Sequence, residues 1–327
     1  MKRRDFLLAT AALMGQSFVP NVLGATEATG KLVYGLDKND LGSRLGRLSS
    51  RLLYEVAPSY LYDLVNVSED STLRATNLVR ESVADGNTLL QATGTIMSLY
   101  PCLYENLPYD PINDFVPVGF LGESTYMLVV GTVVPSSVKT VDDFIDWVFE
   151  NPRYRNIGAT LYGSEGHLAG LTLAHEKNIA LSVQAYGGTS ILVEDLLDGY
   201  IAAGFLATGE ATEAIAARRL RVLGVTSAER HPPWPCVPTL AEQGVAGMDF
   251  KGWYGWLAPS NIPLKSLLKL SNAFEVMHQQ PVFRTLQASL ALNPIDLSPA
   301  EIQFRILKDM ERCEHLYQKY GLSRIVV

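Results

Sequence analysis

The sequence has few of the residues that build metal, redox or disulfide sites. Only three of its 327 residues are cysteine, and Cys102, Cys236 and Cys313 lie far apart with no CxxC pair. There is no HExxH motif, and His167 and His175 are eight residues apart, too far along one helix to share a zinc ion. We therefore expect no metal and no cofactor. In an oxidising compartment one cysteine pair can form a bridge, and the odd count leaves at least one thiol free.

Positive charge and long apolar runs are also scarce. The formal net charge is −7, and no basic run follows the first few residues, which argues against a nucleic-acid partner. No segment reaches about 18 uninterrupted apolar residues, the length that a membrane-spanning helix needs. The 47% hydrophobic and 19% charged content is instead typical of a globular protein with a full core, and 327 residues suffice for about two domains.

The N-terminal segment is typical of an export signal. "MKRRDFLLATAALMGQSFVPNVLGA" has a positively charged start, an apolar stretch and a small-residue end. We expect residues 1–28 to be a signal peptide that is cleaved at about residues 24–28, and the mature protein to be periplasmic. "RRDFL" resembles a twin-arginine signal, whose cargo crosses the membrane folded. The alternative is an ordinary signal with two adjacent arginines.

The rest of the chain alternates between strand and helix patterns. Short apolar runs predict strands, and apolar residues at the helical period predict helices between them. Predicted strands cover 31–36, 62–68, 87–94, 155–161, 180–188, 200–208 and 220–227, and predicted helices cover 40–56, 72–86, 140–151, 165–178, 190–199 and 210–219. This order predicts an α/β protein with mostly parallel sheets, whose ligands collect where strands lead into helices. Such loops are expected at 34–40, 93–98, 160–167, 186–190 and 205–211.

The stretch "GATLYGSEGHLAG", residues 158–170, predicts a strand, a glycine loop and a helix start. Ser164 is a natural N-cap, because its hydroxyl can accept a hydrogen bond from an amide one turn on. The remaining free amides and the helix dipole can bind a carboxylate or phosphate. A nucleophilic Ser164 with His167 as base is the competing interpretation. It is poorly supported, because Tyr162 breaks the Gly-x-Ser-x-Gly elbow and both residues lie in one helix start.

Five segments in order carry a family resemblance: "LYENLPYDPINDFVPVGFL", "YGSEGHLAG", "AYGGTSILVEDLLDG", "LRVLGVTSAERHPPWPCVPTLAEQGVAG" and "GWYGWLAPSNIP". Together they resemble the Bug, or TctC-like, family of periplasmic solute-binding proteins that serve tripartite tricarboxylate transporters. The resemblance implies an α/β, two-domain type II periplasmic binding protein of the Venus-flytrap kind with an interdomain ligand cleft. The expected domains are 29–126 plus 251–327 and 127–250. It also implies that the protein is not an enzyme but a monomer that delivers a small organic acid to membrane transporter subunits.

The resemblance and the helix-start geometry together predict a ligand site without catalytic residues. The expected ligand-binding residues are Asp40, Thr93, Gly94, Gly163, Ser164, His167, Tyr186, Gly187, Gly188, Thr189 and Phe205. Ser164 and the amides of 163–167 are expected to hold the ligand carboxylate, with Thr93 and Gly94 approaching from the opposite domain. Residues 186–189 are expected to form one wall, and His167 to brace the loop.

Several loops depart from the family's pattern. In the first loop Asp40 and Arg44 match, but "LDKN" replaces the family's proline- and glycine-rich run; the second loop keeps only Asn66, and Leu206 replaces an aspartate. A competing hypothesis is therefore a sensor or adaptor that no longer binds a free carboxylate. Acidic residues at 37, 40, 69 and 70 would repel an anion if they faced the cleft, whereas in the alternative they point into solvent, as most carboxylates do.

Overall fold

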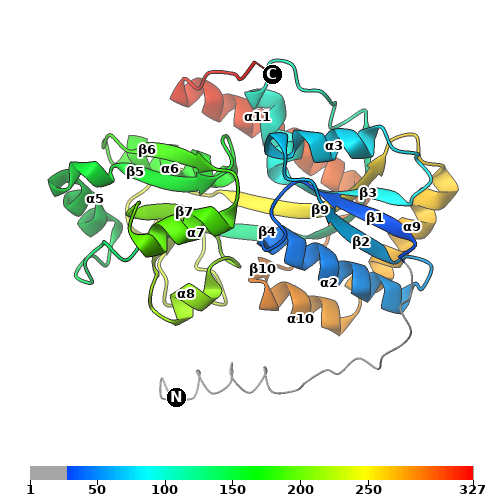
Figure 1. Cartoon of the computed structure of the whole chain (residues 1–327), viewed down its shortest axis with the longest axis horizontal. Helices are drawn as coiled ribbons and strands as arrows, with labels where there is room; N and C mark the ends of the chain where they lie inside the picture. The colour runs from blue at the N-terminus through cyan, green and yellow to red at the C-terminus, as the bar shows by residue number, and fades with distance from the viewer. Residues whose placement is uncertain (1–27, 327) are drawn as a thin grey trace.

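The computed structural model describes residues 28–326, and Figure 1 shows two lobes joined by long strands. Except for its last residue, the expected signal peptide lies outside the described residues. The strands form one hydrogen-bonded network in the order β2-β1-β3-β9-β4-β7-β5-β6, and β8 and β10 pair with β4.

The first lobe begins with three parallel strands, β1 (Gly30–Tyr34), β2 (Tyr62–Asn66) and β3 (Thr88–Thr93). Helices α2 (Leu41–Val56) and α3 (Leu73–Arg80) connect them, as the alternating pattern predicts. After β3 the chain turns through η2 (Thr95–Leu99) and α4 (Tyr100–Leu103), and the short turn η1 (Asp70–Thr72) precedes α3. The carboxyl ends of these strands point toward the second lobe (Figure 1).

Two long antiparallel strands connect the lobes. The 16-residue strand β4 (Phe115–Val130) pairs through its first part with β9 (Lys251–Pro259) and through its last five residues with β7 (Ala203–Ala207). The strand β8 (Arg221–Val225) pairs with the same end of β4. The predicted domain boundary after residue 126 therefore falls inside β4, and the one after residue 250 immediately precedes β9.

The second lobe contains a second set of parallel strands, in which β5 (Asn156–Thr160) lies between β6 (Ser182–Tyr186) and β7. The helices of this lobe are α5 (Val141–Glu150), α6 (Glu165–Glu176), α7 (Thr189–Asp198) and α8 (Thr212–Ala216), with the short turn η3 (Pro152–Tyr154) after α5. Helix α8 starts later than predicted, because Ala211 has a left-handed φ of 52°. Glu210 consequently lies in the loop after β7 instead of in a helix.

The expectation of mostly parallel sheets is wrong for the centre of the molecule. The parallel pairs are confined to the outer strands of each lobe, whereas every antiparallel pair among the described strands includes β4 or β9. The reason is topological: the chain crosses between the lobes in opposite directions along these two strands. The mixed α/β class with two lobes agrees with the expected type II architecture.

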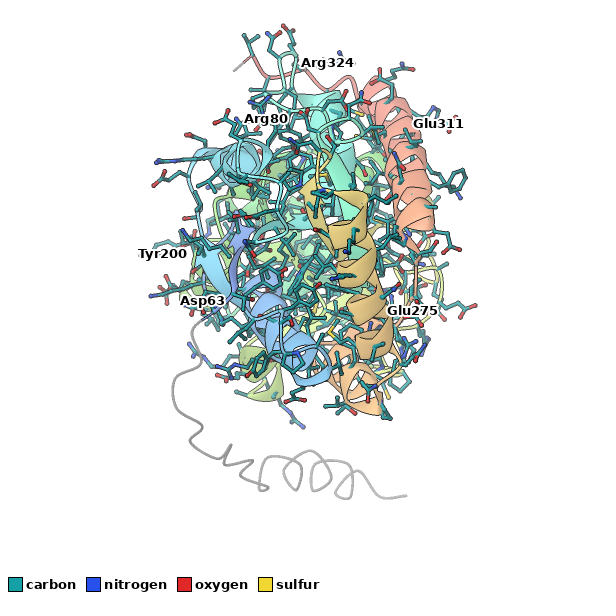
Figure 2. All side chains as sticks on the ribbon, turned by 90° about the vertical axis from the view of Figure 1, so that its right-hand side faces the viewer. Asp63, Arg80, Tyr200, Glu275, Glu311 and Arg324 are labelled. Atoms are coloured by element: carbon teal, nitrogen blue, oxygen red, sulfur yellow. The ribbon has the colours of Figure 1, made fainter. Side chains whose placement is uncertain are left out.

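The C-terminal segment returns to the first lobe as α9 (Leu264–His278), α10 (Pro281–Ser289), β10 (Leu292–Asn293) and α11 (Pro299–Tyr320). Figure 2 shows α9 and α11 along one face, with Glu275 and Glu311 pointing outward. Helix α11 begins with a capping box in which Ser298 and Glu301 each bind the other's backbone amide.

Within residues 28–326, no helix is both long and apolar enough to cross a membrane. Cys102 and Cys313 are buried free thiols, and Cys236 is exposed.

Candidate functional site

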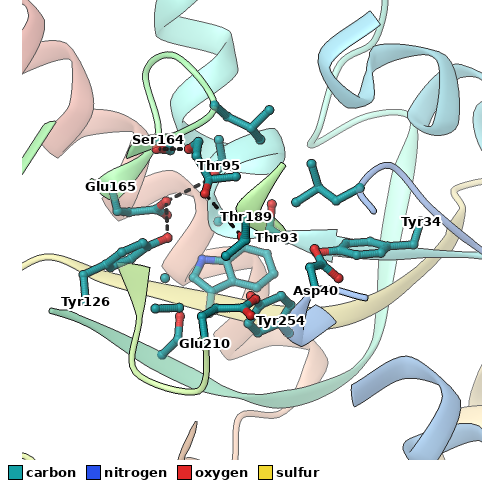
Figure 3. A pocket seen from close by; sticks show the side chains of 18 residues that line it. Tyr34, Asp40, Thr93, Thr95, Tyr126, Ser164, Glu165, Thr189, Glu210 and Tyr254 are labelled. Atoms are coloured by element: carbon teal, nitrogen blue, oxygen red, sulfur yellow. Dashed lines mark hydrogen bonds between the residues drawn. The ribbon is translucent and has the colours of Figure 1, made fainter. Parts of the chain in front are cut away.

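A small cavity lies between the two lobes, and both contribute side chains to it (Figure 3). Its volume is about 50 Å³. The lining residues are Tyr34, Leu36, Asp40, Thr93, Gly94, Thr95, Ser124, Tyr126, Thr160, Leu161, Ser164, Glu165, Thr189, Ala207, Glu210, Gly252, Trp253 and Tyr254. Most of them lie where β1, β3, β5 and β7 end, which is the edge at which α/β sheets collect ligands.

Ser164 begins helix α6 as predicted. Its Oγ accepts a hydrogen bond from the amide of His167 at 3.2 Å and donates one to the carbonyl of Thr160 at 2.6 Å. The hydroxyl therefore holds the loop between β5 and α6 in place, and its proton is already directed at the backbone. His167 is 2% exposed behind this loop, and its ring packs on Tyr162 with centroids 4.5 Å apart. Burial lowers the pKa of His167 to about 4, which favours a neutral ring.

Glu165, the first residue of α6, occupies the place where an external carboxylate was expected. Its Oε2 accepts hydrogen bonds from Thr95 Oγ1 at 2.7 Å and from the Tyr126 hydroxyl at 3.3 Å, so it connects the two lobes. The residue is 7% exposed, and burial raises the pKa of its carboxyl group. Gly94 permits this approach, because a Cβ there would lie 2.7 Å from Glu165 Oε1.

Asp40 faces the cavity from the start of α2. Its carboxylate caps this helix by accepting from the Ser43 amide at 2.7 Å, and it accepts a second bond from the Tyr34 hydroxyl at 3.0 Å. Burial raises the pKa of Asp40 to about 6, against the lowering effect of both hydrogen bonds. The prediction that Asp40 belongs to the cleft agrees with its position.

Glu210 approaches Asp40 from the second lobe. Its Oε1 accepts from the Leu41 amide at 2.5 Å, and its Oε2 lies 3.5 Å from Arg44 Nη2. Burial, and then the negative charge of Asp40, raise the pKa of Glu210 to about 7. Arg44 also donates to the carbonyl of Gly209 at 2.7 Å. The start of α2 and the loop after β7 are thus bonded directly across the cleft.

Five of the predicted ligand-binding residues line the cavity: Asp40, Thr93, Gly94, Ser164 and Thr189. The hydroxyl of Thr189 lies 3.3 Å from that of Thr160, also at the cavity. These residues come from four different segments, and the fold brings them together at the strand ends. Sequence reasoning identified them through the family resemblance together with loop position and helix-start chemistry.

The other six predicted residues lie around the cavity without lining it. Gly163 faces Leu103 and Tyr317, and Phe205 is 1% exposed in the core. The Tyr186 hydroxyl donates to Asp195 at 2.7 Å, away from the cavity. Gly187 has no atom within 4 Å of where its Cβ would be, Gly188 faces Asp37, and His167 lies behind the α6 start. Of the expected wall at 186–189, only Thr189 lines the cavity.

Sequence reasoning missed the acidic and aromatic part of the site. Glu165, Glu210, Tyr34, Tyr126, Trp253 and Tyr254 all line the cavity. The sequence pattern predicts Glu210 to lie in a helix, and it gives no signal that the aromatic residues of 250–259 line a cavity. The one local signal for Glu165 was its position directly after the N-cap serine. A side chain at the start of a helix lies beside the cap and therefore close to any site there.

The acidic residues of the rewritten loops divide into two groups. Asp40 faces the cavity, and Asp37 accepts a hydrogen bond from Ser190 of the opposite lobe at 3.0 Å. Glu69 and Asp70 are exposed, and Glu69 forms an ion pair with Arg74. The concern that acidic residues would face the cleft therefore applies to the first loop and not to the second.

Comparison with protein families gives a match over most of the chain. Residues 67–322 match the model described as the tripartite tricarboxylate transporter family receptor. A UPF0065 protein from the tcbD–tcbE intergenic region of Pseudomonas sp. strain P51 is 29% identical over 249 residues, covering 76% of this chain and 73% of the relative. Protein BugT of Bordetella pertussis is 25% identical over 247 residues, covering 75% of each chain.

Solved structures share the fold at lower sequence identity. The R. palustris protein Rpa4515 with adipate has a TM-score of 0.86 at 24% identity, covering 92% of this chain and all of the other. The periplasmic binding protein BugD has a TM-score of 0.83 at 21% identity, with 92% and 100% coverage. MatC of Rhodopseudomonas palustris with bound malate has a TM-score of 0.79 at 22% identity, with 88% and 98% coverage.

Proposed function

Because this chain belongs to the tripartite tricarboxylate transporter receptor family of periplasmic solute-binding proteins, we propose that it captures a small carboxylate ligand and presents it to a membrane transporter. The observation that carries this proposal is the cavity between the lobes, to which both lobes contribute polar side chains. A ligand bound there contacts both lobes and therefore favours their closure. A transporter can recognise the closed conformation. The adipate and malate bound to two proteins of the same fold support a small carboxylate as the ligand class.

One end of the cavity suits a carboxylate group. Thr93, Gly94, Ser164 and Thr189 line the cavity, and helix α6 starts there. Glu165 lies at the same helix start, and burial raises the pKa of its carboxyl group, which favours the uncharged form beside a ligand carboxylate. Hydroxyl groups and helix-start amides stabilise negative charge without a buried cation. Ser164 contributes to ligand binding in this proposal by redirecting its proton from the Thr160 carbonyl to the ligand.

The lobes of the proposed receptor are residues 29–126 plus 251–327 and residues 127–250. Export through the twin-arginine route is part of the same proposal, since a receptor of this kind works in the periplasm. Replacing Arg3 and Arg4 with lysine tests the route: we expect export to fall, measured as the fraction of mature protein in the periplasm. Unchanged export would mean that an ordinary secretory signal is used.

The decisive experiment is a thermal-shift screen of the mature chain against mono-, di- and tricarboxylates, amino acids and aromatic acids. A ligand that binds only the folded chain at 100 times its Kd adds about 2.7 kcal/mol to the unfolding free energy and raises Tm. Hits are then measured by calorimetry. If no carboxylate-bearing compound raises Tm, the proposal fails, and a sensor or adaptor that reads a protein partner takes its place.

A further inference from the structure

We propose that the ligand of this cavity carries a protonated amine, which the carboxylates of Asp40 and Glu210 bind between aromatic rings. This inference rests on the proposed function and narrows its ligand class, from small carboxylates to those that also bear an amine. Its evidence is independent of the family match, because it comes from the charges and side chains at one end of the cavity.

The charge of the cavity lining is of one sign. Asp40, Glu165 and Glu210 line it, and no lysine, arginine or histidine is among the lining residues. Each of the three carboxyl groups belongs to a residue that is at least nine-tenths buried. Among residues 28–326, Arg44 is the one cation that forms an ion pair with any of them, at 3.5 Å from Glu210, and its own side chain is 36% exposed. Burying a carboxylate without a neighbouring cation costs free energy. A ligand that supplies a positive charge removes this cost, and its binding is therefore favoured.

Aromatic side chains surround these carboxyl groups. Tyr34, Tyr126, Trp253 and Tyr254 line the cavity, and Figure 3 shows Glu210 beside Tyr254 and Asp40 beside Tyr34. The electron-rich face of an aromatic ring attracts an ammonium group, and carboxylates beside such rings strengthen this attraction. The aromatic walls of the cavity and its carboxyl groups thus both favour an ammonium group.

Hydroxyl groups also line the cavity, among them those of Ser124 and Tyr254. A hydroxyl oxygen can accept hydrogen bonds, and the N–H groups of an ammonium ion supply donors for it.

A plain dicarboxylate fits this end of the cavity poorly. Its second carboxylate would lie against Asp40 and Glu210, and two like charges near each other in a buried site repel strongly. A ligand with one carboxylate toward Thr93 and Ser164 and one ammonium group toward Asp40 and Glu210 avoids this repulsion at Asp40 and Glu210. Near Ser164 its carboxylate meets Glu165, whose pKa is raised by burial toward the uncharged form. The volume of about 50 Å³ further favours a small compound.

The direction of the pH dependence separates the two ligand types. The titratable or charged groups around Asp40 and Glu210 are Tyr34 from β1, Asp37 from the loop after it, Arg44 from α2, Tyr126 from β4, Glu165 from α6 and Tyr254 from β9. Burial raises the pKa of Asp40 to about 6 and that of Glu210 to about 7, so both groups ionise between pH 5 and 8. Binding of an ammonium group should therefore strengthen as the pH rises through this range, whereas binding of an anion beside these groups should weaken.

The experiment compares matched compounds that differ in one amine: glycine with acetate, β-alanine with propionate, and 4-aminobutyrate with butyrate. Ethanolamine and 1,4-diaminobutane serve as amines without a carboxylate. Affinities are measured by isothermal titration calorimetry on the mature chain at pH 5.5 and pH 8. We expect at least one amino acid to bind ten times tighter than its amine-free partner, and its affinity to rise several-fold at pH 8.

Glu210→Gln removes one carboxylate while keeping the oxygen that accepts from Leu41. Glu213→Gln is the matched control, because it makes the same change of charge three residues away at an exposed position outside the cavity. We expect Glu210→Gln to weaken binding of the amino acid at least tenfold at pH 8 and to remove most of its pH dependence. Glu213→Gln should leave both unchanged.

The possible outcomes distinguish this inference from the proposed function. If acetate, propionate or butyrate binds as tightly as its amino counterpart, or if binding weakens at pH 8, the amine inference is wrong and the carboxylate receptor stands. If only ethanolamine or 1,4-diaminobutane binds, the amine inference holds and the carboxylate part of the proposed function fails. If neither these compounds nor the wider carboxylate screen gives binding, both are wrong.

Discussion

At the scale of single residues, buried carboxyl groups control the stability of the cleft. The pKa of Asp40 rises from 3.8 to about 6, and that of Glu210 from 4.5 to about 7. A carboxyl group with a raised pKa binds its proton more tightly in the folded chain than in the unfolded chain. Its contribution to stability is therefore complete below the unfolded pKa and is lost as the pH rises through the folded pKa. We expect each group to lower the unfolding free energy by roughly 2–3 kcal/mol between about pH 4 and pH 8.

Glu210→Gln tests this linkage without any ligand. The amide does not ionise, so the decline in unfolding free energy between pH 5 and 8 should become less steep. Denaturant unfolding at several pH values measures the slope, with Glu213→Gln as the control. Equal slopes for the parent and the Glu210→Gln variant would mean that Glu210 has an ordinary pKa in the folded chain.

Ser164 contributes a second effect at this scale, because its hydroxyl caps α6 and also binds the carbonyl of Thr160. We expect Ser164→Ala to lower the unfolding free energy by about 1 kcal/mol. Calorimetric titration of the same variant measures the proposed contact with the ligand, for which we expect a roughly tenfold loss of affinity, the lower end of what a hydrogen bond to a charged group is worth. Loss of stability with full affinity would identify Ser164 as a cap alone.

At the scale of elements, the conformation of the loop between β5 and α6 depends on one glycine. Gly163 has a φ of 72°, and a Cβ there would lie 2.7 Å from Leu103 Cδ2 and 2.9 Å from the Tyr317 hydroxyl. Both the left-handed backbone and the close approach of α4 and α11 require a residue without a side chain. We expect Gly163→Ala to cost about 1–3 kcal/mol of unfolding free energy.

Gly187 provides the matched control for that substitution. It lies at the end of the neighbouring strand β6, and nothing lies within 4 Å of where its Cβ would be. Gly187→Ala should therefore leave the unfolding free energy within about 0.5 kcal/mol of the parent. If the two variants unfold alike in urea, neither the strain nor the packing at Gly163 holds the loop.

At the scale of the whole molecule, a few polar contacts hold the two lobes together across the cleft. The Leu41 amide and Arg44 bond to Glu210 and Gly209, and Ser190 bonds to Asp37. These contacts stabilise closure before any ligand contributes. Ligand binding and lobe contacts therefore favour the same conformation, so weakening the contacts should also weaken ligand binding.

Arg44→Ala tests this coupling. Arg44 is partly exposed, so we expect a loss of about 1 kcal/mol of closure energy and an open-to-closed ratio about fivefold higher. The radius of gyration of the chain without added ligand, measured by small-angle X-ray scattering, should rise. Arg47→Ala is the control, because Arg47 bonds within its own lobe to the carbonyl of Lys38. A radius of gyration that is the same in both variants would rule out a role for Arg44 in closure.

The order of strands and helices could be predicted from the sequence alone, because local periodicity and helix caps depend on neighbouring residues. The cap at Ser164 followed from such a local signal, and five residues of the cavity followed from loop position together with the family resemblance. The direction of the central strands could not, because β4 and β9 pair across more than 120 residues of sequence. Long-range pairing depends on how the lobes assemble, and local pattern does not encode it.

The α/β class, the helix starts at the cleft and the resemblance to a receptor family all follow from patterns along the chain. The charge of the site, in contrast, depends on how the chain is folded. Asp40, Glu165 and Glu210 are separated by more than 40 residues from one another, and each is an unremarkable acidic residue in its own segment. The fold buries all three around one cavity with no lysine or arginine in its lining. Electrostatic energy depends on distance and burial in space, and both are fixed only when the two lobes come together.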